Sequence, residues 1–591
     1  MIKSYLILIA QTDSYGFHPV YMRTYMLDFS MDEFDALTTH DIGSTFLGLT
    51  PHQSNNILPQ EASLGGTLPL SYESDEQQIF RGTKNFDFLT GEQSNDTLYG
   101  LAGDDTLNGQ QGDDIINGGT DNDLLVGEKG NDILIDGDGG DLMIGGEGAV
   151  EFWISDWDIS DKPSTISDFH VGTDTIKIGR LGVTFDSLTF QKNKWSTTIY
   201  EDGKPLAILM AVDKDLTPQS FIFGDANLAN ELQTNLEKSI STSEAPGVTQ
   251  AIMTPDGFTW KGAAGLSNIE AQGNMHSDDI FSVASVTKAF TGATVLKVVE
   301  SGQISLDDTL GQRLPEIAKN ISGGEDITLR QLLNGSSGIP SFNSSQQFKA
   351  DVDAGTFADK TPEEIVEYVY DQPLFSGFQS SPIWAYTNTG DIIAALMVEQ
   401  ATGQSFAQLM EDNVIEPLGL ENTLYGIPAE TPDNLASSYL NEVGKTPSNI
   451  TDFDVTNLSA FGASAGLFSN AEDVARFQKA LFEGELLSKD SFNELVNFVD
   501  TGLSGQQRYG LGVLERPDKA SEAWGKTWSF VGNSFGYNSL SYYLPDNGGY
   551  VNTVLTNGKD AFGSILQNPP SAIIDSSLEI VSNDFSSEQI A

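Results

Sequence analysis

Apolar residues recur every nine positions between residues 82 and 144. Written in nines, this segment gives seven units, and in each unit the sixth residue is Asp and the eighth is apolar. The eighth residues are Leu89, Leu98, Leu107, Ile116, Leu125, Leu134 and Met143. The pattern predicts a tight glycine turn and a very short strand in each unit, with the apolar residues stacked in a narrow core. A flexible acidic linker would not keep an apolar residue in register for so long.

The pattern of apolar and polar residues changes on both sides of this segment. The apolar run in residues 1–10 is shorter than the core of a signal peptide and lacks a small-residue cleavage site, so it predicts a strand. Residues 241–247 are small and polar, and alternating helix and strand patterns follow them. The predicted order is a β-rich amino-terminal region of unknown function (1–78), a repeat region (79–148), a β-rich cap (149–240), a linker (241–247), an α/β enzyme domain (248–570) and a carboxyl-terminal tail (571–591).

Composition and charge exclude several classes of function. The chain has 591 residues with a formal net charge of −54 and no cysteine. So large a negative charge repels nucleic acids and anionic lipid surfaces, and the missing cysteines exclude disulfides, thiolate nucleophiles and Cys-ligated metals. The sequence contains no apolar run of about 20 residues that would cross a bilayer.

The repeats resemble the calcium-binding β-roll of repeats-in-toxin (RTX) proteins, with consensus G-G-x-G-x-D-x-U-x. The segment holds 14 acidic residues against two lysines, so hard cations are needed to fold it. The resemblance implies structural Ca²⁺ bound by Asp96, Asp105, Asp114, Asp123 and Asp132. The first unit departs from the consensus, which makes Asp87 a doubtful ligand. We expect chelation to unfold the roll and to leave the enzyme domain intact.

Three serine motifs compete in the second half of the chain. Two G-x-S-x-G matches centre on Ser464 and Ser534, but that pattern requires a later histidine and none follows His276. The third motif, S-x-x-K, joins Ser285 to Lys288. Apolar residues at spacings of four, three and three follow it and predict a helix that ends near Gly302.

The position of Ser285 at the start of this helix suits a nucleophile. The positive end of the helix dipole and the unpaired amides favour a developing oxyanion, and Lys288 lies one turn away on the same face. A lysine acts as a base only where burial or a neighbouring cation lowers its pKa, so this role requires an interior position. Tyr386 and Asn388 lie in an extended segment two residues apart, so both side chains can face one pocket.

Residues from about 247 to 560 resemble the serine β-lactamase and D-Ala-D-Ala carboxypeptidase superfamily, closest to its AmpC-type and esterase branch. The resemblance rests on four segments in order: residues 281–288, 327–339, 386–388 and 417–420. It implies an antiparallel sheet with a helical subdomain, Ser285 as acylated nucleophile and Lys288 with Tyr386 as the proton-transfer pair. It also implies Asn388 as a substrate-orienting group, and an oxyanion hole made by the amides of Ser285 and Asn533.

The third motif of that superfamily departs from its usual form. Relatives carry a basic residue two positions before a glycine, whereas this chain has Phe530 before Gly532. A shifted alignment on Lys526 restores the base but loses the glycine. Because Phe530 cannot pair with a substrate carboxylate, we predict a preference for esters over penicillins or D-Ala-D-Ala peptides.

The predicted function is a secreted, calcium-binding serine hydrolase acting on a peptide, β-lactam or ester, possessing no catalytic cofactor. One-step export without a cleaved signal peptide is implied by the RTX resemblance. The alternatives are a non-catalytic cell-wall or β-lactam binding protein, and a structural RTX adhesin. Partners are a small-molecule or peptide substrate and calcium ions, with no nucleic acid and no membrane span.

Overall fold

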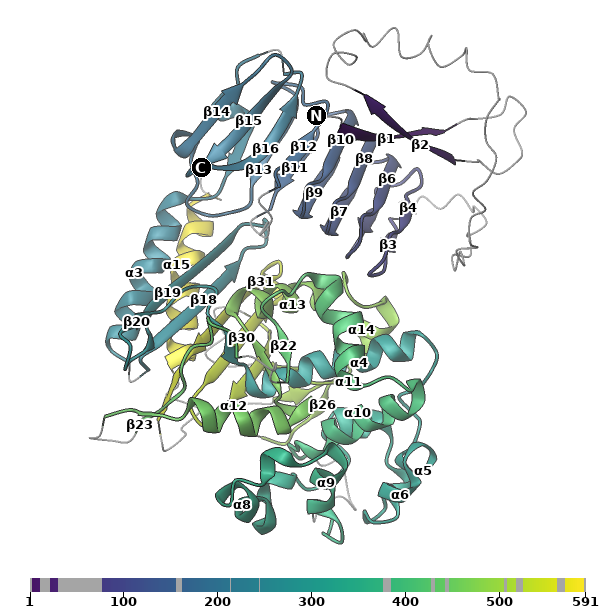
Figure 1. Ribbon diagram of the computed structural model, residues 1–591, viewed down its shortest axis with the longest axis vertical. Coiled ribbons are helices and arrows are strands. Elements are labelled where there is room, and N and C mark those ends of the chain that lie inside the picture. The colour runs from purple at the N-terminus through teal and green to yellow at the C-terminus, as the bar shows by residue number, and fades with distance from the viewer. Residues whose placement is uncertain are drawn as a thin grey trace. The chain divides into compact units, whose positions relative to one another are not determined.

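The computed structural model describes residues 3–10, 22–29, 77–155, 162–212, 214–243, 245–375, 384–426, 431–441, 446–503, 507–516, 525–560 and 569–588 (Figure 1). The chain divides into two compact units, residues 1–73 and 74–591. In the first unit, β1 (Lys3–Ala10) pairs with β2 (Met22–Phe29) in an antiparallel ladder, so the strand predicted at the start of the chain is confirmed.

Successive repeats place their strands alternately in two parallel sheets. One sheet contains β3 (Ile79–Arg81), β5 (Thr97–Tyr99), β7 (Ile115–Thr120), β9 (Ile133–Asp138) and β11 (Glu151–Ile154). The other contains β4 (Phe88–Thr90), β6 (Thr106–Gln111), β8 (Leu124–Lys129), β10 (Leu142–Glu147) and β12 (Ser164–Ile166). Leu107 lies opposite Leu125, so each strand pairs with the strand two repeats further on.

The predicted narrow core of the repeat region (79–148) is present. Leu98, Leu107, Ile116, Leu125, Leu134 and Met143 are all 0% exposed. The two sheets continue into the cap through β13 (Thr175–Ile178), β14 (Leu188–Lys192), β15 (Ser196–Glu201), β16 (Lys204–Met210) and β17 (Phe221–Phe223). Phe152 and Phe221 of the cap belong to the same apolar cluster, so the cap covers the end of the repeat core.

The carboxyl-terminal domain (226–588) is built on a nine-stranded antiparallel sheet. Its strand order is β20 (Gly273–Asn274), β19 (Thr259–Asn268), β18 (Gly247–Met253), β31 (Tyr550–Thr556), β30 (Asn538–Leu544), β29 (Thr527–Asn533), β28 (Leu514–Arg516), β27 (Arg508–Tyr509) and β26 (Val499–Asp500). The sheet and the helices beside it agree with the fold implied by the resemblance.

Two helices from opposite ends of this domain lie side by side on one face of the sheet: α3 (Ala226–Ser241) and α15 (Pro569–Glu588) (Figure 1). Leu228, Leu232 and Leu236 of α3 pack with Ile574 of α15. The structure therefore corrects two expected boundaries, since α3 packs on this sheet rather than forming part of the cap and α15 is not a tail. The apolar spacing of four in α3 carried this signal in the sequence.

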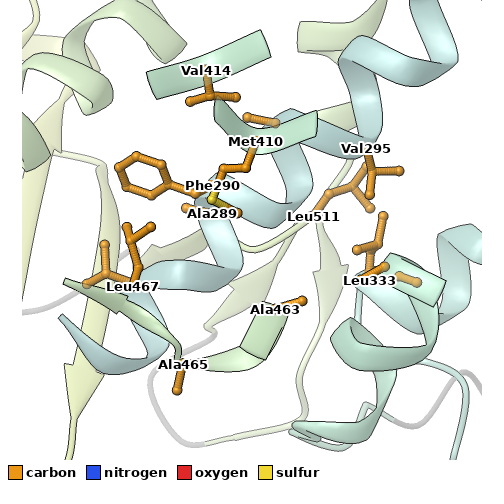
Figure 2. Packing of buried hydrophobic residues seen from close by; sticks show 14 of the residues in the cluster. Ala289, Phe290, Val295, Leu333, Met410, Val414, Ala463, Ala465, Leu467 and Leu511 are labelled. Carbon is orange, nitrogen blue, oxygen red and sulfur yellow. The ribbon is translucent and has the colours of Figure 1, made fainter. Parts of the chain in front are cut away.

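The opposite face of the sheet is covered by α13 (Ala471–Phe482), and α4 (Thr287–Glu300) packs against α13 through Phe290 and Phe477. Because α4 is buried almost all round, it runs through the middle of the domain. Figure 2 shows Ala289 and Phe290 of α4 among side chains from other elements, including Met410 and Leu467. This packing fixes the helix whose first turn follows Ser285.

Shorter elements complete the helical part of the domain and its minor sheets. The helices are α5 (Leu310–Arg313), α6 (Pro315–Ala318), α7 (Leu329–Leu333), α8 (Gln346–Asp353), α9 (Pro362–Val366), α10 (Thr389–Thr402), α11 (Phe406–Met410), α12 (Thr451–Ala460) and α14 (Lys489–Leu495). The strands are β21 (Phe281–Ser282), β25 (Leu467–Ser469) and β22 (Leu424–Tyr425) in one sheet, and β24 (Ser448–Asn449), β23 (Tyr439–Asn441) and β32 (Gly558–Asp560) in another.

The repeat region packs directly against the carboxyl-terminal domain. Leu101 is 4% exposed and belongs to the apolar cluster of that domain. Arg81 donates from Nε to the carbonyl oxygen of Gly484 at 2.5 Å, and Lys84 forms ion pairs with Asp412 and Glu416. These contacts change the expectation that the two parts unfold separately, because removal of the repeat region would expose part of the other domain's core.

Candidate active site

Ser285 lies on a strained turn between β21 and α4. The turn is a 3-10 helix over Ala284–Val286, and Ala284 adopts a left-handed conformation with φ of 47°. Non-glycine residues rarely adopt this conformation, and such strain collects at functional sites. Thr287 stabilises the turn because its hydroxyl donates to the carbonyl oxygen of Ala284 at 2.6 Å. Ser285 is therefore presented at the amino end of a rigid helix.

Lys288 occupies the interior position that the sequence interpretation requires. The residue is 2% exposed, and its Nζ donates to Asn388 Oδ1 at 2.7 Å and to the carbonyl oxygen of Ser464 at 2.6 Å. Its Nζ lies 3.5 Å from Oδ2 of Asp391 and 5.2 Å from the centre of the Tyr386 ring. The structure thus brings Lys288 together with Tyr386 and Asn388, which follow it by about 100 residues in the sequence.

Tyr386 and Asn388 differ in exposure, as their proposed roles require. Tyr386 is 44% exposed and its ring lies near that of Trp384, whereas Asn388 is 7% exposed. The backbone amide of Asn388 donates to the hydroxyl of Ser341 at 2.9 Å, which fixes the residue at the start of α10. The phenol can therefore reach a substrate, while the amide group is oriented by its bond to Lys288.

Strand β29 runs close to the turn that carries Ser285. A Cβ atom at Gly532 would lie 2.0 Å from the carbonyl oxygen of Val283, so only glycine permits this approach. Strand β28 pairs with β29 over Thr527–Ser529 and does not continue to Gly532 in the described register. The close approach at Gly532 places this residue and the next one, Asn533, beside the turn that carries Ser285. The resemblance expects the second oxyanion amide at this position.

The structure corrects the expected position of Phe530. Its side chain is 1% exposed and packs on Phe477 and Phe482 of α13, so little of its surface is available to a substrate. The shifted alignment is not supported either, because exposed Lys526 lies six residues before Gly532, about 20 Å along an extended strand. Successive residues of a strand face opposite sides, and this alternation directs Phe530 into the core.

The serines of the two G-x-S-x-G motifs, Ser464 and Ser534, are buried and form hydrogen bonds within their own turns. Ser464 is 0% exposed and its hydroxyl donates to the carbonyl oxygen of Phe461 at 2.8 Å. Ser534 donates to Oδ2 of Asp454 at 3.0 Å and accepts the backbone amide of Tyr537 at 2.8 Å. His276, the only histidine that could serve a conventional triad, is exposed. Both motifs form buried turns, as the sequence argument favoured.

Sequence reasoning missed two buried carboxylates near the candidate site. Asp454 accepts from Ser438, from the Ser534 hydroxyl and from the backbone amide of Gly536, so it stabilises the turn that follows Asn533. Burial raises the pKa of Asp454 above its ordinary value. Asp391 lies behind Lys288, and burial raises its pKa to about 6 against the opposing effect of Lys288. A single Asp in a helix gives no signal in the sequence. The one available hint was its position, since Asp391 follows Tyr386 by only five residues.

The aspartates of the repeat region form a second candidate site. In a regular series, Oδ1 of Asp105, Asp114, Asp123 and Asp132 accepts the backbone amide of the residue 18 positions earlier. Their Oδ2 atoms are buried and have no hydrogen-bond partner. Oδ2 of Asp96 instead accepts the amide of Glu92 at 2.7 Å, and Oδ2 of Asp87 accepts that of Thr83 at 2.6 Å.

The surroundings of these Oδ2 atoms fit a hard cation. A Cβ atom placed at Gly127 would lie 2.4 Å from Asp132 Oδ2 and 2.6 Å from the carbonyl oxygen of Gly145. Carboxylate and carbonyl oxygens therefore surround one small space, as Ca²⁺ requires. Among the described residues, no three His, Asp or Glu side chains are grouped so that they alone could hold a metal ion, so turn carbonyls must complete each site.

Burial makes these carboxylates unfavourable as anions. It raises the pKa of Asp105 and Asp123 to about 8, that of Asp114 to about 7 and that of Asp132 to about 6. A bound divalent cation offsets this cost by favouring the ionised form. The donor atoms present thus fit the calcium implied by the resemblance.

The antiparallel sheet, with a buried lysine one helical turn after a serine, is the arrangement of a serine hydrolase of the β-lactamase type. The chain belongs to the Beta-lactamase family, whose sequence pattern matches residues 232–569, more than half of its length. The RTX calcium-binding nonapeptide repeat matches residues 81–116, 90–125 and 117–149.

The names of individual relatives indicate different activities. Penicillin-binding protein 4* of Bacillus subtilis is 26% identical over 47% of this chain and 60% of its own length. Esterase EstB of Burkholderia gladioli is 24% identical over 51% of this chain and 82% of its own. The D-amino acid amidase structure from Ochrobactrum anthropi SV3 (22% identity, TM-score 0.51) covers 61% of this chain and 99% of that one, and it shows the same fold. Among the described helices, none is long and apolar enough to cross a membrane.

Substitution of Gly532 by alanine is expected to impair hydrolysis strongly. The new Cβ atom would meet the Val283 carbonyl at 2.0 Å and move β29 away from the nucleophile turn. A displacement of about 1 Å in an active site costs on the order of 100-fold in rate. The measurement is kcat/KM for an activated ester, with Val531→Ala on the other face of the strand as control. Wild-type turnover by folded Gly532→Ala would contradict the assignment of this strand.

Proposed function

We propose that the protein is a secreted, calcium-binding serine hydrolase that works through an acyl-enzyme on Ser285. The observation that carries this proposal is Lys288, buried one helical turn after Ser285 and hydrogen-bonded to Asn388. A buried lysine in contact with an exposed tyrosine beside a helix-terminal serine is an arrangement suited to proton transfer. A binding protein or an adhesin would not need this arrangement.

In the proposed reaction, Ser285 Oγ attacks the acyl carbon of the substrate. Its proton passes to the pair formed by Lys288 and Tyr386 and then to the leaving group, and water releases the acyl group by the reverse route. The amides of Ser285 and Asn533 stabilise the oxyanion, and the Asn388 side chain orients the substrate. The repeat region would bind Ca²⁺ through the Oδ2 atoms of Asp105, Asp114, Asp123 and Asp132, where the ion supplies structural stability. Export to a calcium-containing medium is proposed from the match to RTX repeats.

We also propose that the substrate's reactive end is uncharged. Strand β29 has the sequence TWSFVGN and contains no basic residue. Because Phe530 is buried, the reason for the preference is this missing cation and not a contact with an aromatic ring. The name of Esterase EstB supports an ester, whereas that of penicillin-binding protein 4* supports a β-lactam or peptide.

The test compares a penicillin with its own methyl ester, which differs only in the carboxylate. We expect the free acid to react no faster than the ester, since a charge-assisted contact of about 1.5 to 3 kcal/mol is missing. Such a contact would favour the acid by about 10- to 150-fold in kcat/KM. A short-chain nitrophenyl ester serves as the neutral reference substrate. A clear preference for the free acid would contradict the proposed specificity.

A further inference from the structure

The turns between successive strands of the repeat region form two rows. One row, which we call the docked row, contains the turns 82–87, 100–105 and 118–123, and the other, the free row, contains the turns 109–114 and 127–132. Each row holds two carboxylates whose Oδ2 atom is buried without a partner: Asp105 and Asp123 in the docked row, Asp114 and Asp132 in the free row. The two rows therefore offer equivalent donors to a cation and differ in their other contacts.

Two contacts of the docked row fall on one stretch of the carboxyl-terminal domain, residues 411–419. Lys84, in the first turn of the row, forms an ion pair with Asp412. In the third turn, the side chain of Thr120 touches the backbone of the domain, since a Cβ atom at Gly419 would lie 2.4 Å from Thr120 Cγ2. The first and third turns of the row are thus both seated on the 411–419 stretch.

The middle turn of the docked row adds an apolar contact and connects to the third turn. Leu101 belongs to the apolar cluster of the carboxyl-terminal domain, and its carbonyl oxygen accepts the backbone amide of Thr120 at 2.8 Å. A Cβ atom at Gly100 would lie 2.7 Å from Asp105 Oδ2 and 2.2 Å from the carbonyl oxygen of Gly118. Because these two oxygens come from the middle and third turns, a cation between them would join the two turns that contact the domain.

The free row has different surroundings. Among the described residues, the hydrogen bonds of turns 109–114 and 127–132 stay within the repeat region and its cap. Asp113, for example, accepts the backbone amide of Asn131 at 2.7 Å. Lys129 of this row is exposed, and it lies in no ion pair of the described residues. A cation in the free row therefore stabilises the roll without a direct contact to the other domain.

The 411–419 stretch connects the docked row to the helix that follows the nucleophile. The stretch forms two short helical turns. Its Val414 and the preceding Met410 are fully buried and lie close to Ala289 of α4 (Figure 2). Ala289 follows Lys288 directly in the sequence. Because close-packed side chains transmit displacement, a shift of this stretch reaches the helical turn that holds the candidate catalytic lysine.

We propose that calcium bound in the docked row supports the active site, so that hydrolysis depends on Asp105 and Asp123 more than on Asp114 and Asp132. This inference rests on the proposed function. Ions in the docked row hold the 411–419 stretch against α4, whereas ions in the free row act on the roll. Coupling between two sites is reciprocal, so contact with the domain also raises the calcium affinity of the docked row. The repeats thereby confine full hydrolase activity to media that contain calcium.

The test measures hydrogen exchange of the 411–419 stretch, and kcat/KM for a neutral ester, in saturating Ca²⁺. Asp105→Asn is compared with Asp114→Asn, since each variant replaces one unpartnered buried carboxylate by a neutral group of the same shape. We expect the stretch to exchange at least about 5-fold faster in Asp105→Asn than in Asp114→Asn, with kcat/KM lower in the same order. Equal effects, a larger effect in Asp114→Asn, or a stretch insensitive to both variants would overturn the inference.

A second pair of variants keeps every calcium ligand and decides the question if Asp105→Asn does not fold. Lys84→Glu places an acidic side chain opposite Asp412, and Lys129→Glu makes the same change of charge in the free row. Reciprocity predicts that titration with Ca²⁺ gives an affinity at least about 5-fold lower in Lys84→Glu than in Lys129→Glu. Equal affinities would contradict the proposal. Exchange and affinity require no turnover, so they remain decisive even if Ser285→Ala keeps its activity and the proposed function fails.

Discussion

Replacement of Ser285 by alanine is expected to lower ester hydrolysis by several orders of magnitude without unfolding the protein. Ser285 is half-buried in the middle of its turn and belongs to no apolar cluster, so loss of its hydroxyl removes little packing. The attacking oxygen disappears, and the remaining oxyanion amides and binding groups give only residual catalysis. Steady-state kinetics and a thermal melt of the same preparation measure the two effects.

Lys288→Ala should be similarly inactive, and the double variant should be no worse than either single one. The two residues act as a unit, so their losses do not add. Ser464→Ala is the control, because it removes the hydroxyl of a competing motif and retains the carbonyl that binds Lys288. If folded Ser464→Ala were inactive and Ser285→Ala active, the nucleophile would have to be reassigned.

Removal of calcium is expected to unfold the repeat region and to destabilise the carboxyl-terminal domain with it. Buried Asp side chains such as Asp105 and Asp123 lose their counter-ion, so the repeats can no longer bury them as anions. Leu101 and Arg81 then leave their contacts with the other domain. Differential scanning calorimetry with and without EDTA should show a loss of stability in both transitions, or in one shared transition.

A variant isolates the contact between the two parts. Leu101→Ala should lower the melting temperature of the carboxyl-terminal domain in saturating calcium, since truncating a buried leucine costs about 2 to 5 kcal/mol. Phe86→Ala is the matched control, because Phe86 is a large apolar residue of the same region that is 67% exposed. A carboxyl-terminal transition that is insensitive to both EDTA and Leu101→Ala would show that the contacts carry no stability.

The repeats and the Ser285–Lys288 pair were predictable because each depends on spacing along the chain. A nine-residue period fixes which residues are buried, and Leu107 and Ile116 are found fully buried as expected. The S-x-x-K spacing places Ser285 and Lys288 one turn apart on one helix face, whereas the burial of Lys288 was a requirement of its role that only the structure could test. Local periodicity therefore determines these features before any tertiary contact forms.

Features that depend on tertiary contacts were missed or misplaced. The direction of Phe530 follows from which face of β29 meets α13, and motif alignment contains no such information. The pairing of α3 with α15 joins segments more than 300 residues apart. Asp391 gains its importance only because α10 packs against α4 and brings its carboxylate to Lys288.

Intact-mass measurement tests the central claim most directly. Wild-type protein in calcium is incubated with a penicillin and with an activated ester, and Ser285→Ala is treated identically. The account predicts a mass increase equal to one acyl group in wild type, located on the peptide that contains Ser285 and absent from the variant. An adduct of equal size on Ser285→Ala, or turnover of the ester by that variant, would contradict an acyl-enzyme on Ser285.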